Sequence, residues 1–388
     1  MSRFDQIVDR KKTQSVKWDT IEANYKQKDL LPMWVADMDF KAPEAVQKAF
    51  KNYLEQGVFG YSIVPDSLYE AIINWQKNRH NFTIKKEEIL LNSGVVPSLA
   101  LSVQAYTKPK EAVLIHDPVY PPFAQVVEEN DRKLVRSKLN TDDKFTMNLE
   151  EMEKLFQKEN IRLFILCNPH NPGGRVWSKE ELQAVGKLCK KYNVIVVSDE
   201  IHQDIVYQPE TFTTFQNADP SFKDFSIVLT AATKTFNLAG IKNSMVFIKN
   251  EKLRQAFASI QKKNCQDDIN TFGVIGTQAA YEGGKDWLDD LLVYLKENIN
   301  TTYNFFQNEL PNVKVSKPEA TYLMWLDFSA YHLTDKQLEE KFINEAKVVL
   351  NPGISYGPKG SQHMRINLAC PRATLKEGLQ RIATAFKS

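Results

Sequence analysis

Three stretches in the middle of the chain decide the fold: LFILCNPHNPGG at 163–174, VIVVSDEIHQD at 194–204 and IVLTAATKTFNLAG at 227–240. Each begins with a short apolar run, typical of a strand buried on both faces. Helical spacing separates several such runs, as in SKEELQAVGKLCKKYN, where Ser178 and Glu181 have the spacing of a capping box. Strands that alternate with helices in this way predict an α/β fold with a mainly parallel sheet covered on both faces.

Further runs extend this pattern, and the last hundred residues depart from it. AVLIH at 112–116 and MVFI at 245–248 read as additional buried strands. A long helix is expected over 286–308, followed by the strand-like segments TYLMWLDF and HMRINLAC with helices around them. Mixed elements of this kind predict a smaller α+β domain. The expected boundaries are 44–287 for the large domain, and 1–43 with 288–388 for the small domain.

Composition and charge exclude several classes of protein. Lys and Arg total 50 and Asp and Glu total 48, too balanced for a protein that binds nucleic acid by electrostatics. The N-terminal MSRFDQIVDRKKTQS lacks the apolar core of a signal peptide, and no apolar run approaches the ~20 residues of a membrane span. No CxxC pair occurs among Cys167, Cys189, Cys265 and Cys370. We therefore expect a reduced, cytoplasmic protein with no metal site and no nucleic-acid or membrane partner.

Side chains suited to catalysis follow four successive predicted strands. Tyr120 follows the first, Asn171 the second, Asp199 the third and Lys234 the fourth. Ligands of open α/β sheets bind beyond the carboxyl ends of the strands. A lysine that can form a Schiff base, an acid for a pyridinium nitrogen and a ring to cover the cofactor face suit pyridoxal phosphate. P-loop, GxGxxG, HExxH and GxSxG motifs are absent from the sequence.

Each of these residues also has an ordinary interpretation. Asp199 could cap a helix, NPHNPGG is turn-forming by composition, and Tyr120 could be a packed loop aromatic. A single lysine such as Lys234 is usually a solvated surface charge, and His202 could be a satisfied helix histidine. The order of the set on successive strand ends favours the functional interpretation.

The same segments resemble the fold-type I pyridoxal-phosphate enzymes, the aspartate aminotransferase superfamily. NPHNPGG, SDEIHQD and ATKTFNLAG occur in that order, accompanied by PMWVADMDFKAP, GVFGYS, NSGVVPSL, DPVYPPF, LNPGISYG and HMRINLACP. Together these motifs are similar to the MalY/PatB group of cystathionine β-lyases, and they cover nearly the whole chain. The resemblance implies a seven-stranded, mainly parallel sheet in the large domain and a homodimer acting on a small amino acid.

The resemblance implies roles at the ring of the cofactor. Lys234 is expected to carry the Schiff base and to move protons, and Asp199 to pair with the pyridine nitrogen. Tyr120 is expected to stack on the ring. Asn171 is expected to hydrogen-bond the ring oxygen and to help hold the substrate carboxylate.

It also implies how the phosphate is held. Gly94, Val95 and Val96 are expected to supply backbone amides at a helix start, where anions bind favourably. Thr233 adds a hydroxyl. Tyr61 is expected to reach the phosphate in the other subunit and so to contribute to its substrate site.

Substrate contacts and two departures complete the comparison. Arg365 is expected to bind the substrate α-carboxylate as a bidentate pair. The loop with Val35 and Ala36 is expected to close over the substrate. Lys242 stands where many relatives have a phosphate-binding arginine, and His202 where many have a tyrosine that contacts the ring oxygen. Both are candidate cofactor-binding residues; Lys242 could serve as a point charge for the phosphate or point to solvent, and the contact of His202 with the ring oxygen stays open.

Two fates of the substrate stay open after removal of its Cα proton. Loss of a thiolate from Cβ gives pyruvate, ammonia and a thiol, which is the reaction of a carbon–sulfur β-lyase on cystathionine, cysteine or S-substituted cysteines. Return of the proton to the cofactor gives transamination. The WVADMDF and DEIHQD motifs favour the lyase; an aminotransferase and a pyridoxal-phosphate-binding regulatory protein are the alternatives.

Overall fold

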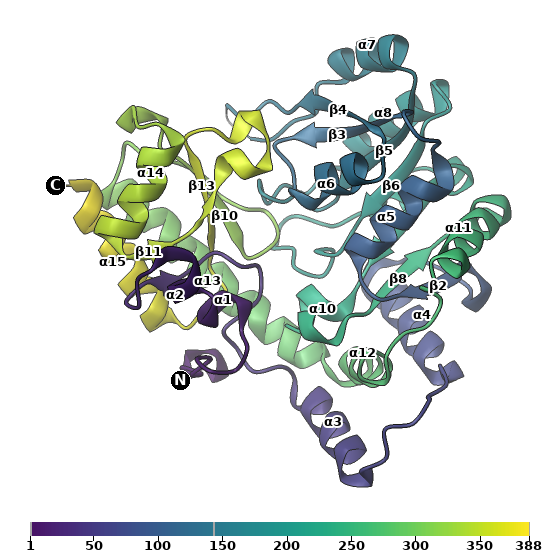
Figure 1. The fold of residues 1–388 in the computed structure, drawn as a ribbon, viewed down its shortest axis with the longest axis horizontal. Coiled ribbons are helices and arrows are strands. Elements are labelled where there is room, and N and C mark those ends of the chain that lie inside the picture. Colours follow the sequence, from purple (N-terminus) through teal and green to yellow (C-terminus); the bar gives the residue numbers. More distant parts are fainter. Residues whose placement is uncertain (1, 143, 388) are drawn as a thin grey trace.

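The computed structural model describes residues 2–142 and 144–387. Its larger part is built on a seven-stranded sheet with the order β2-β8-β7-β6-β5-β3-β4 (Figure 1). All strands run parallel except β8, which is antiparallel to both of its neighbours. The mainly parallel α/β sheet is therefore confirmed. The strands are β2 (Ile89–Asn92), β3 (Ala112–Asp117), β4 (Lys133–Lys138), β5 (Ile161–Cys167), β6 (Ile195–Asp199), β7 (Ser226–Thr230) and β8 (Ser244–Phe247).

Helices bury both faces of this sheet. In β5, Leu163 and Ile165 pack into a core with one set of helices, whereas Phe164 and Leu166 point into a core on the opposite face. The apolar run of β5 is thus explained by burial on both sides. On the first face lie α5 (Val95–Tyr106), α6 (Pro122–Glu129) and α11 (Glu251–Lys263); on the second lie α7 (Leu149–Glu159) and α8 (Lys179–Lys191).

The smaller part contains a four-stranded antiparallel sheet with the order β12-β13-β10-β9. Its strands are β9 (Lys314–Ser316), β10 (Leu323–Asp327), β12 (Asn351–Pro352) and β13 (His363–Asn367). Two helices pack with it, α14 (Asp335–Lys341), which continues into a π-helical turn over Phe342–Ala346, and α15 (Arg372–Lys387). The mixed α+β character predicted for the C-terminal hundred residues is present.

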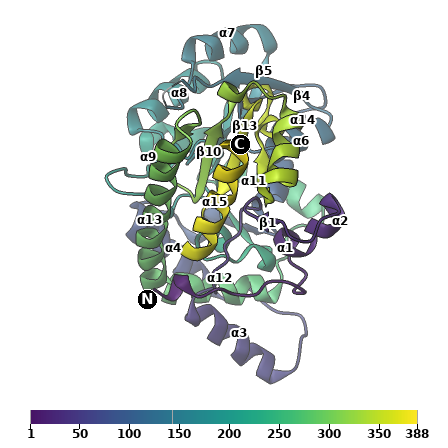
Figure 2. The ribbon, with the colours of Figure 1, turned by 90° about the vertical axis from the view of Figure 1, so that its left-hand side faces the viewer.

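The N-terminal segment joins this smaller part. Its strand β1 (Leu31–Pro32) pairs in parallel with β11 (Val348–Val349). Figures 1 and 2 show α1 (Val16–Asp19) and α2 (Ile21–Tyr25) on the same side of the molecule as β13 and α15. Segments far apart in the sequence therefore build one side of the molecule together.

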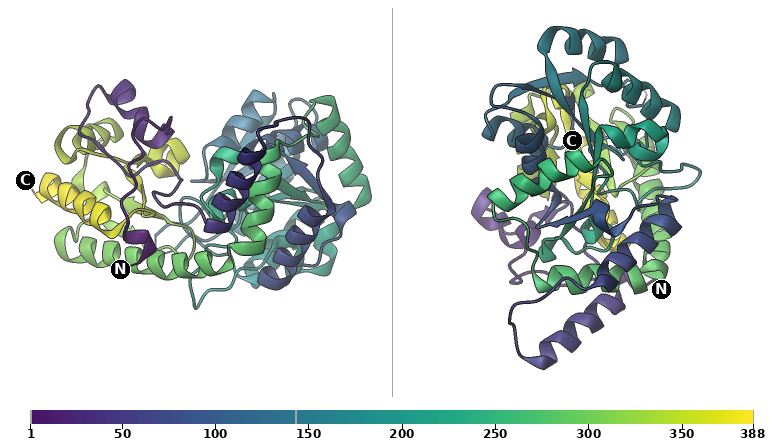
Figure 3. Two further views of the ribbon diagram at one scale, coloured as in Figure 1. Left: turned by 90° about the horizontal axis from the view of Figure 1, so that it is seen from below. Right: turned by 90° about the vertical axis from the view of Figure 1, so that its right-hand side faces the viewer.

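A single long helix connects the two parts. α13 (Lys285–Glu309) runs beneath both in the left view of Figure 3, within one residue of the predicted 286–308 at each end. Its buried side chains, including Leu288 and Phe306, enter a core that also receives residues of α4 (Asp66–His80), α12 (Thr271–Gly283) and α15. None of the helices among the described residues combines the length and apolarity needed to cross a membrane.

Candidate active site

A cavity of about 470 Å³ lies at the carboxyl ends of the parallel strands. Most of the predicted site residues line it, although they come from elements spread over two hundred residues of sequence. Lys234 and Asp199 both line this cavity, as their strand-end positions predict. The predicted residues in the lining are Ala36, Gly94, Val95, Val96, Tyr120, Asn171, Asp199, His202, Thr233, Lys234 and Lys242.

Lys234 lies on a one-turn helix, α10 (Ala232–Thr235), directly after β7. Its Nζ donates a hydrogen bond to the backbone oxygen of Ala36 at 2.6 Å. Burial, reinforced by the positive charge of Arg365, lowers the pKa of Lys234 to about 8. The amine is therefore available as a proton acceptor near neutral pH, which an ordinary lysine is not.

Asp199 ends β6 and is 3% exposed. Its Oδ1 accepts a hydrogen bond from the backbone N–H of Ile201 at 3.1 Å, and it forms no ion pair with any described residue. Burial raises its pKa to about 7 because a carboxylate without a cation is costly in a dry site. A protonated ring nitrogen placed against it would supply the missing positive charge.

The start of α5 lies in the lining of the cavity. Gly94 caps the helix with φ of 154°, a conformation that side chains rarely adopt, and the first turn contributes Val95 and Val96 to the lining. Unpaired N–H groups at a helix start carry partial positive charge and favour phosphate. Thr233 and Lys242 line the same cavity with a hydroxyl and an ammonium.

Arg365 lies on β13 behind the cavity wall rather than in it. Its Nη1 donates to Oδ1 of Asn171 at 3.0 Å, and its Nη2 donates to Oδ1 of Asn351 at 2.6 Å and to the backbone oxygen of Trp34 at 3.0 Å. The guanidinium also lies over the Tyr356 ring, 5.2 Å from its centre. The buried Nε has no hydrogen-bond partner among the described residues.

His202 lies in the lining of the cavity, whereas Tyr61 lies on the protein surface. His202 is buried in the lining, its Nδ1 has no partner in the described part of the chain, and burial lowers its pKa to about 3. It is therefore a neutral imidazole with an open nitrogen. Tyr61 is fully exposed on the loop after α3 (Glu44–Gln56) and lies outside the cavity of its own chain.

Several residues of the site were not predicted. Ser93, Cys167 and Asn243 line the cavity, and Asn351 and Tyr322 hold its wall through Arg365 and the Ala36 carbonyl. Asn351 and Ser93 lie within the segments LNPGISYG and NSGVVPSL, so position in a motif was the available signal. Cys167 and Asn243 are adjacent to strand ends.

A larger cavity of about 700 Å³ lies along α4 and the turn that carries Gln203 and Asp204. Its buried carboxylate, Asp204, already accepts hydrogen bonds from Trp75, Thr235 and His80. No predicted site residue lines it. The smaller cavity is therefore the better candidate for chemistry.

The residues present fit pyridoxal phosphate. Among the described residues, a buried carboxylate that forms no ion pair, a histidine nitrogen without a hydrogen-bond partner and the start of a helix line the same cavity as a lysine of lowered pKa. These groups match a pyridinium nitrogen, a ring substituent, a phosphate and an aldehyde carbon. An ordinary packed core would not leave this combination of polar groups around a cavity.

Comparison with known proteins agrees with this geometry. The chain is 43% identical to the cystathionine β-lyase PatB of Bacillus subtilis over 384 residues, which cover 99% of each protein. Cystalysin from Treponema denticola, solved with a pyridoxal 5′-phosphate cofactor, superposes with a TM-score of 0.96 at 33% identity, covering 100% of this chain and 99% of that one. The PLP-bound C–S lyase of Staphylococcus hominis gives 0.92 at 35% identity, covering 99% and 98%.

The family assignment rests on the whole chain rather than on isolated motifs. The family model for aminotransferase class I and II matches residues 28–382. That span includes every residue of the cavity lining, from Ala36 to Asn243, together with Arg365. The chain belongs to the aminotransferase class I and II family.

Proposed function

We propose that the protein is a pyridoxal-phosphate-dependent carbon–sulfur β-lyase that acts on L-cystathionine, cysteine and S-substituted cysteines. The observation that carries the proposal is the full-length similarity to a cystathionine β-lyase, combined with a cavity that holds Lys234, Asp199 and Asn171 together. The products are pyruvate, ammonia and a thiol. The C–S lyase of S. hominis supports the same chemistry.

The chain offers a partner for each part of the cofactor. Lys234 would be the attachment point, Asp199 would pair with the ring nitrogen, and Tyr120 would stack on the ring. Thr233 and the start of α5 at Gly94 receive the phosphate, with Val95, Val96 and Lys242 beside them. When bound, pyridoxal phosphate supplies the electron sink that makes the Cα proton of an amino acid removable.

Arg365 and Asn171 orient the substrate. Arg365 binds the α-carboxylate through charge-assisted hydrogen bonds, for which its Nε has no competing acceptor in the described residues. Asn171 is held by Arg365 at 3.0 Å, so one contact fixes both groups. A carboxylate fixed in this way directs the Cα–H bond toward Lys234.

Lys234 moves the proton. With a pKa of about 8, roughly a tenth of the amines are neutral at pH 7, enough to accept the proton from Cα. Asp199 keeps a negative charge beside the ring nitrogen and so stabilises its protonated form. The electron pair of the former Cα–H bond forms a Cα=Cβ double bond as the Cβ–S bond breaks, and the electron pair of that bond leaves with sulfur. The thiolate takes up a proton, and water hydrolyses the released aminoacrylate to pyruvate and ammonia.

We further propose a homodimer in which Tyr61 reaches the phosphate site of the other subunit. Support comes from the loop around Tyr61, where Val58, Phe59 and Ile63 are also exposed. Apolar side chains gathered on one surface are typical of an interface. The seven-stranded sheet lies within 44–287, whereas the four-stranded sheet and the β1–β11 pair lie within 1–43 and 288–388, which supports a division into domains at these bounds. The free thiols of all four cysteines support a cytoplasmic location.

A product assay tests the proposed reaction. Purified protein with pyridoxal phosphate receives L-cystathionine or L-cysteine without a keto acid. Pyruvate, ammonia and a thiol or sulfide are expected in both reactions. Turnover that begins only when a keto acid is added identifies an aminotransferase instead.

The Lys234→Ala variant tests the regulatory alternative. General-base catalysis contributes about 10²–10⁴-fold, so elimination is expected to fall at least this far. Far-UV circular dichroism checks that the variant is folded. A biological effect that persists in this variant without any turnover would identify a binding role.

A further inference from the structure

The loop from Trp34 to Phe40, called the strap below, accepts hydrogen bonds from both Arg365 and Lys234 through its backbone carbonyls. The carbonyl of Trp34 accepts a hydrogen bond from Nη2 of Arg365 at 3.0 Å. The carbonyl of Ala36 accepts one from Nζ of Lys234 at 2.6 Å and one from the Tyr322 hydroxyl at 2.9 Å. A small shift of the strap therefore moves groups beside both Arg365 and Lys234.

The side chains of two asparagines form hydrogen bonds with the backbone of the strap. Nδ2 of Asn367, on the strand of Arg365, donates to the carbonyls of Val35 and Asp37 at 2.6 and 2.7 Å. Asn237, three residues after Lys234, accepts from the N–H of Met38 at 2.9 Å and donates to its carbonyl at 2.9 Å. The strap thus bridges the lysine turn and the arginine strand.

The acidic side chains of the strap enter an ion cluster formed with the N-terminal segment. Arg10 binds Asp37 through two hydrogen bonds of 2.9 and 2.7 Å, and Asp39 through one of 2.8 Å. Nζ of Lys17 donates to Asp39 at 2.8 Å. Nε1 of Trp18 donates to the same carboxylate at 2.9 Å. Two cations and two carboxylates thus balance each other.

Because the ion pair of Lys17 and Asp39 is buried, loss of either residue would destabilise the cluster. The Lys17 side chain is 1% exposed and that of Asp39 is 4% exposed. Breaking a buried pair leaves an uncompensated charge, whereas an exposed pair contributes little. The planar guanidinium of Arg10 also fixes direction, because it holds Asp37 with two parallel bonds.

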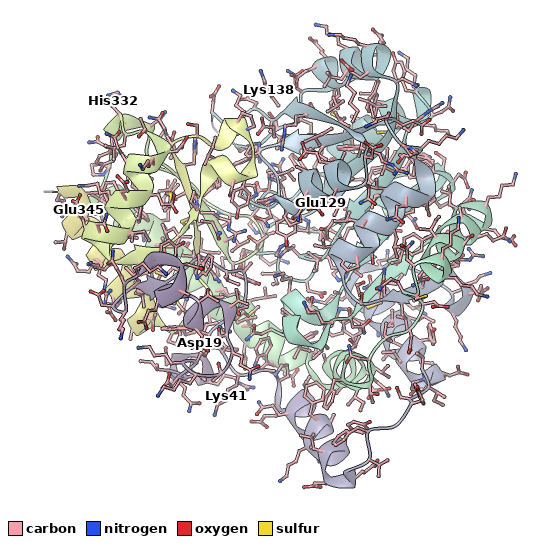
Figure 4. All side chains as sticks on the ribbon, in the orientation of Figure 1. Asp19, Lys41, Glu129, Lys138, His332 and Glu345 are labelled. Carbon is pink, nitrogen blue, oxygen red and sulfur yellow. The ribbon has the colours of Figure 1, made fainter. Side chains whose placement is uncertain are left out.

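The N-terminal segment is itself folded so as to present these cations. Asp19, labelled in Figure 4, accepts hydrogen bonds from the backbone N–H groups of Lys12, Thr13 and Ser15 at 2.8–3.0 Å. This closes the turn between Arg10 and Lys17. Both cations therefore reach the strap from one rigid turn.

We propose that Arg10 is a positioning residue for substrate binding: through Asp37 and the strap, it sets where Arg365 meets the α-carboxylate of the amino acid. This inference rests on the proposed function, since it assigns Arg365 to the substrate. Arg10 touches neither cofactor nor substrate in this account. Its main effect is on the binding of the amino acid, because the Ala36 carbonyl beside Lys234 is also held by the Tyr322 hydroxyl.

The test compares holoenzymes of the wild type, Arg10→Met, Arg10→Lys and the control Lys41→Met. Lys41 follows the strap directly, is exposed, and forms no ion pair with a described residue (Figure 4). L-alanine, which has no leaving group, is titrated at equal cofactor content, and its dissociation constant is read from cofactor absorbance. KM and kcat are measured with L-cystathionine.

The expected result is weaker binding of the amino acid with little change in turnover. Arg10→Met raises the dissociation constant of L-alanine and the KM for L-cystathionine about tenfold. A change of this size is less than the full contribution of a bidentate pair of charge-assisted hydrogen bonds. The kcat changes less than about threefold. Arg10→Lys retains the charge and gives an intermediate rise; Lys41→Met matches the wild type. A purely structural role would lower the folded fraction without moving the dissociation constant.

An unchanged dissociation constant in folded Arg10→Met overturns the inference. If that variant does not fold, Arg10→Lys decides: a raised constant supports the inference and an unchanged one overturns it. The L-alanine titration needs no elimination. Failure of the wild type to release pyruvate would therefore count against the proposed function and leave the test of Arg10 readable.

Discussion

At the scale of single residues, Asp199 combines burial with the lack of a counter-ion. Its pKa is raised to about 7 in the folded chain, against 3.8 for an ordinary aspartate. Between these values the folded state binds more protons than the unfolded state. The contribution of Asp199 to the free energy of unfolding of the cofactor-free protein should therefore fall as pH rises from about 4 to 7 and level off above pH 7.

Replacing Asp199 by Asn removes that contribution, which amounts to as much as about 4 kcal/mol across the interval. Glu200 is the built-in comparison, because burial raises its pKa to about 7 as well. We expect the free energy of unfolding of the wild type minus that of Asp199→Asn to fall as pH rises from about 4 to 7, measured by urea unfolding of the cofactor-free protein at several pH values. Glu200 is retained in both proteins and cancels in this difference. An identical pH dependence in the variant and the wild type would contradict the account.

The sequence best predicted the positions of those polar residues that lie at or just after the end of a strand. Lys234 and Asp199 were predictable because a strand end exposes its next residues to the ligand edge of the sheet. Arg10 was not, because an arginine in a charged, aperiodic segment gives no sign of the carboxylates it will meet 27 and 29 residues later. The placement of Arg365 behind Asn171 likewise needed the three-dimensional structure.

At the scale of elements, the start of α5 depends on a backbone shape that only glycine adopts easily. Gly94→Ala places a side chain at φ of 154°, and its Cβ would lie 3.4 Å from Cδ of Pro97. Strain of this kind costs about 1–3 kcal/mol, so cofactor affinity should fall about 5- to 150-fold. Turnover at saturating cofactor should change much less.

Gly240→Ala is the matched control for that prediction. A Cβ at Gly240 meets no atom within 4 Å, and the residue has no positive φ. Cofactor affinity is measured by fluorescence titration of the cofactor-free protein. Equal losses in the two variants would show that strain at the helix start does not govern phosphate binding.

Strands were predictable in proportion to their burial. β5 and β7 are almost entirely buried and appear in the sequence as apolar runs. β4 is an edge strand whose KLVRSK alternates polar and apolar residues with both ends exposed, so no apolar run marks it. β1 is two residues long and exists because β11 lies beside it, a contact that local sequence cannot encode.

At the scale of the whole molecule, the exposed loop around Tyr61 predicts assembly. Sedimentation should give a species of twice the 44.6 kDa chain mass. Phe59→Asp places a charge among exposed apolar side chains and should shift the protein toward monomer, with weaker cofactor retention because Tyr61 of the other subunit is lost. Lys41→Asp, outside this loop, should leave the dimer intact. A fully active wild-type monomer at working concentration would contradict the prediction.

The central claim is that this chain directs the substrate toward breakage of the Cβ–S bond. The most direct measurement is the molar ratio of pyruvate to thiol released from L-cystathionine, with and without added keto acid. The account predicts a ratio of one in both conditions, with ammonia in equal amount and no dependence on the keto acid. Turnover that requires the keto acid, with amino-group transfer and no thiol released, would contradict it.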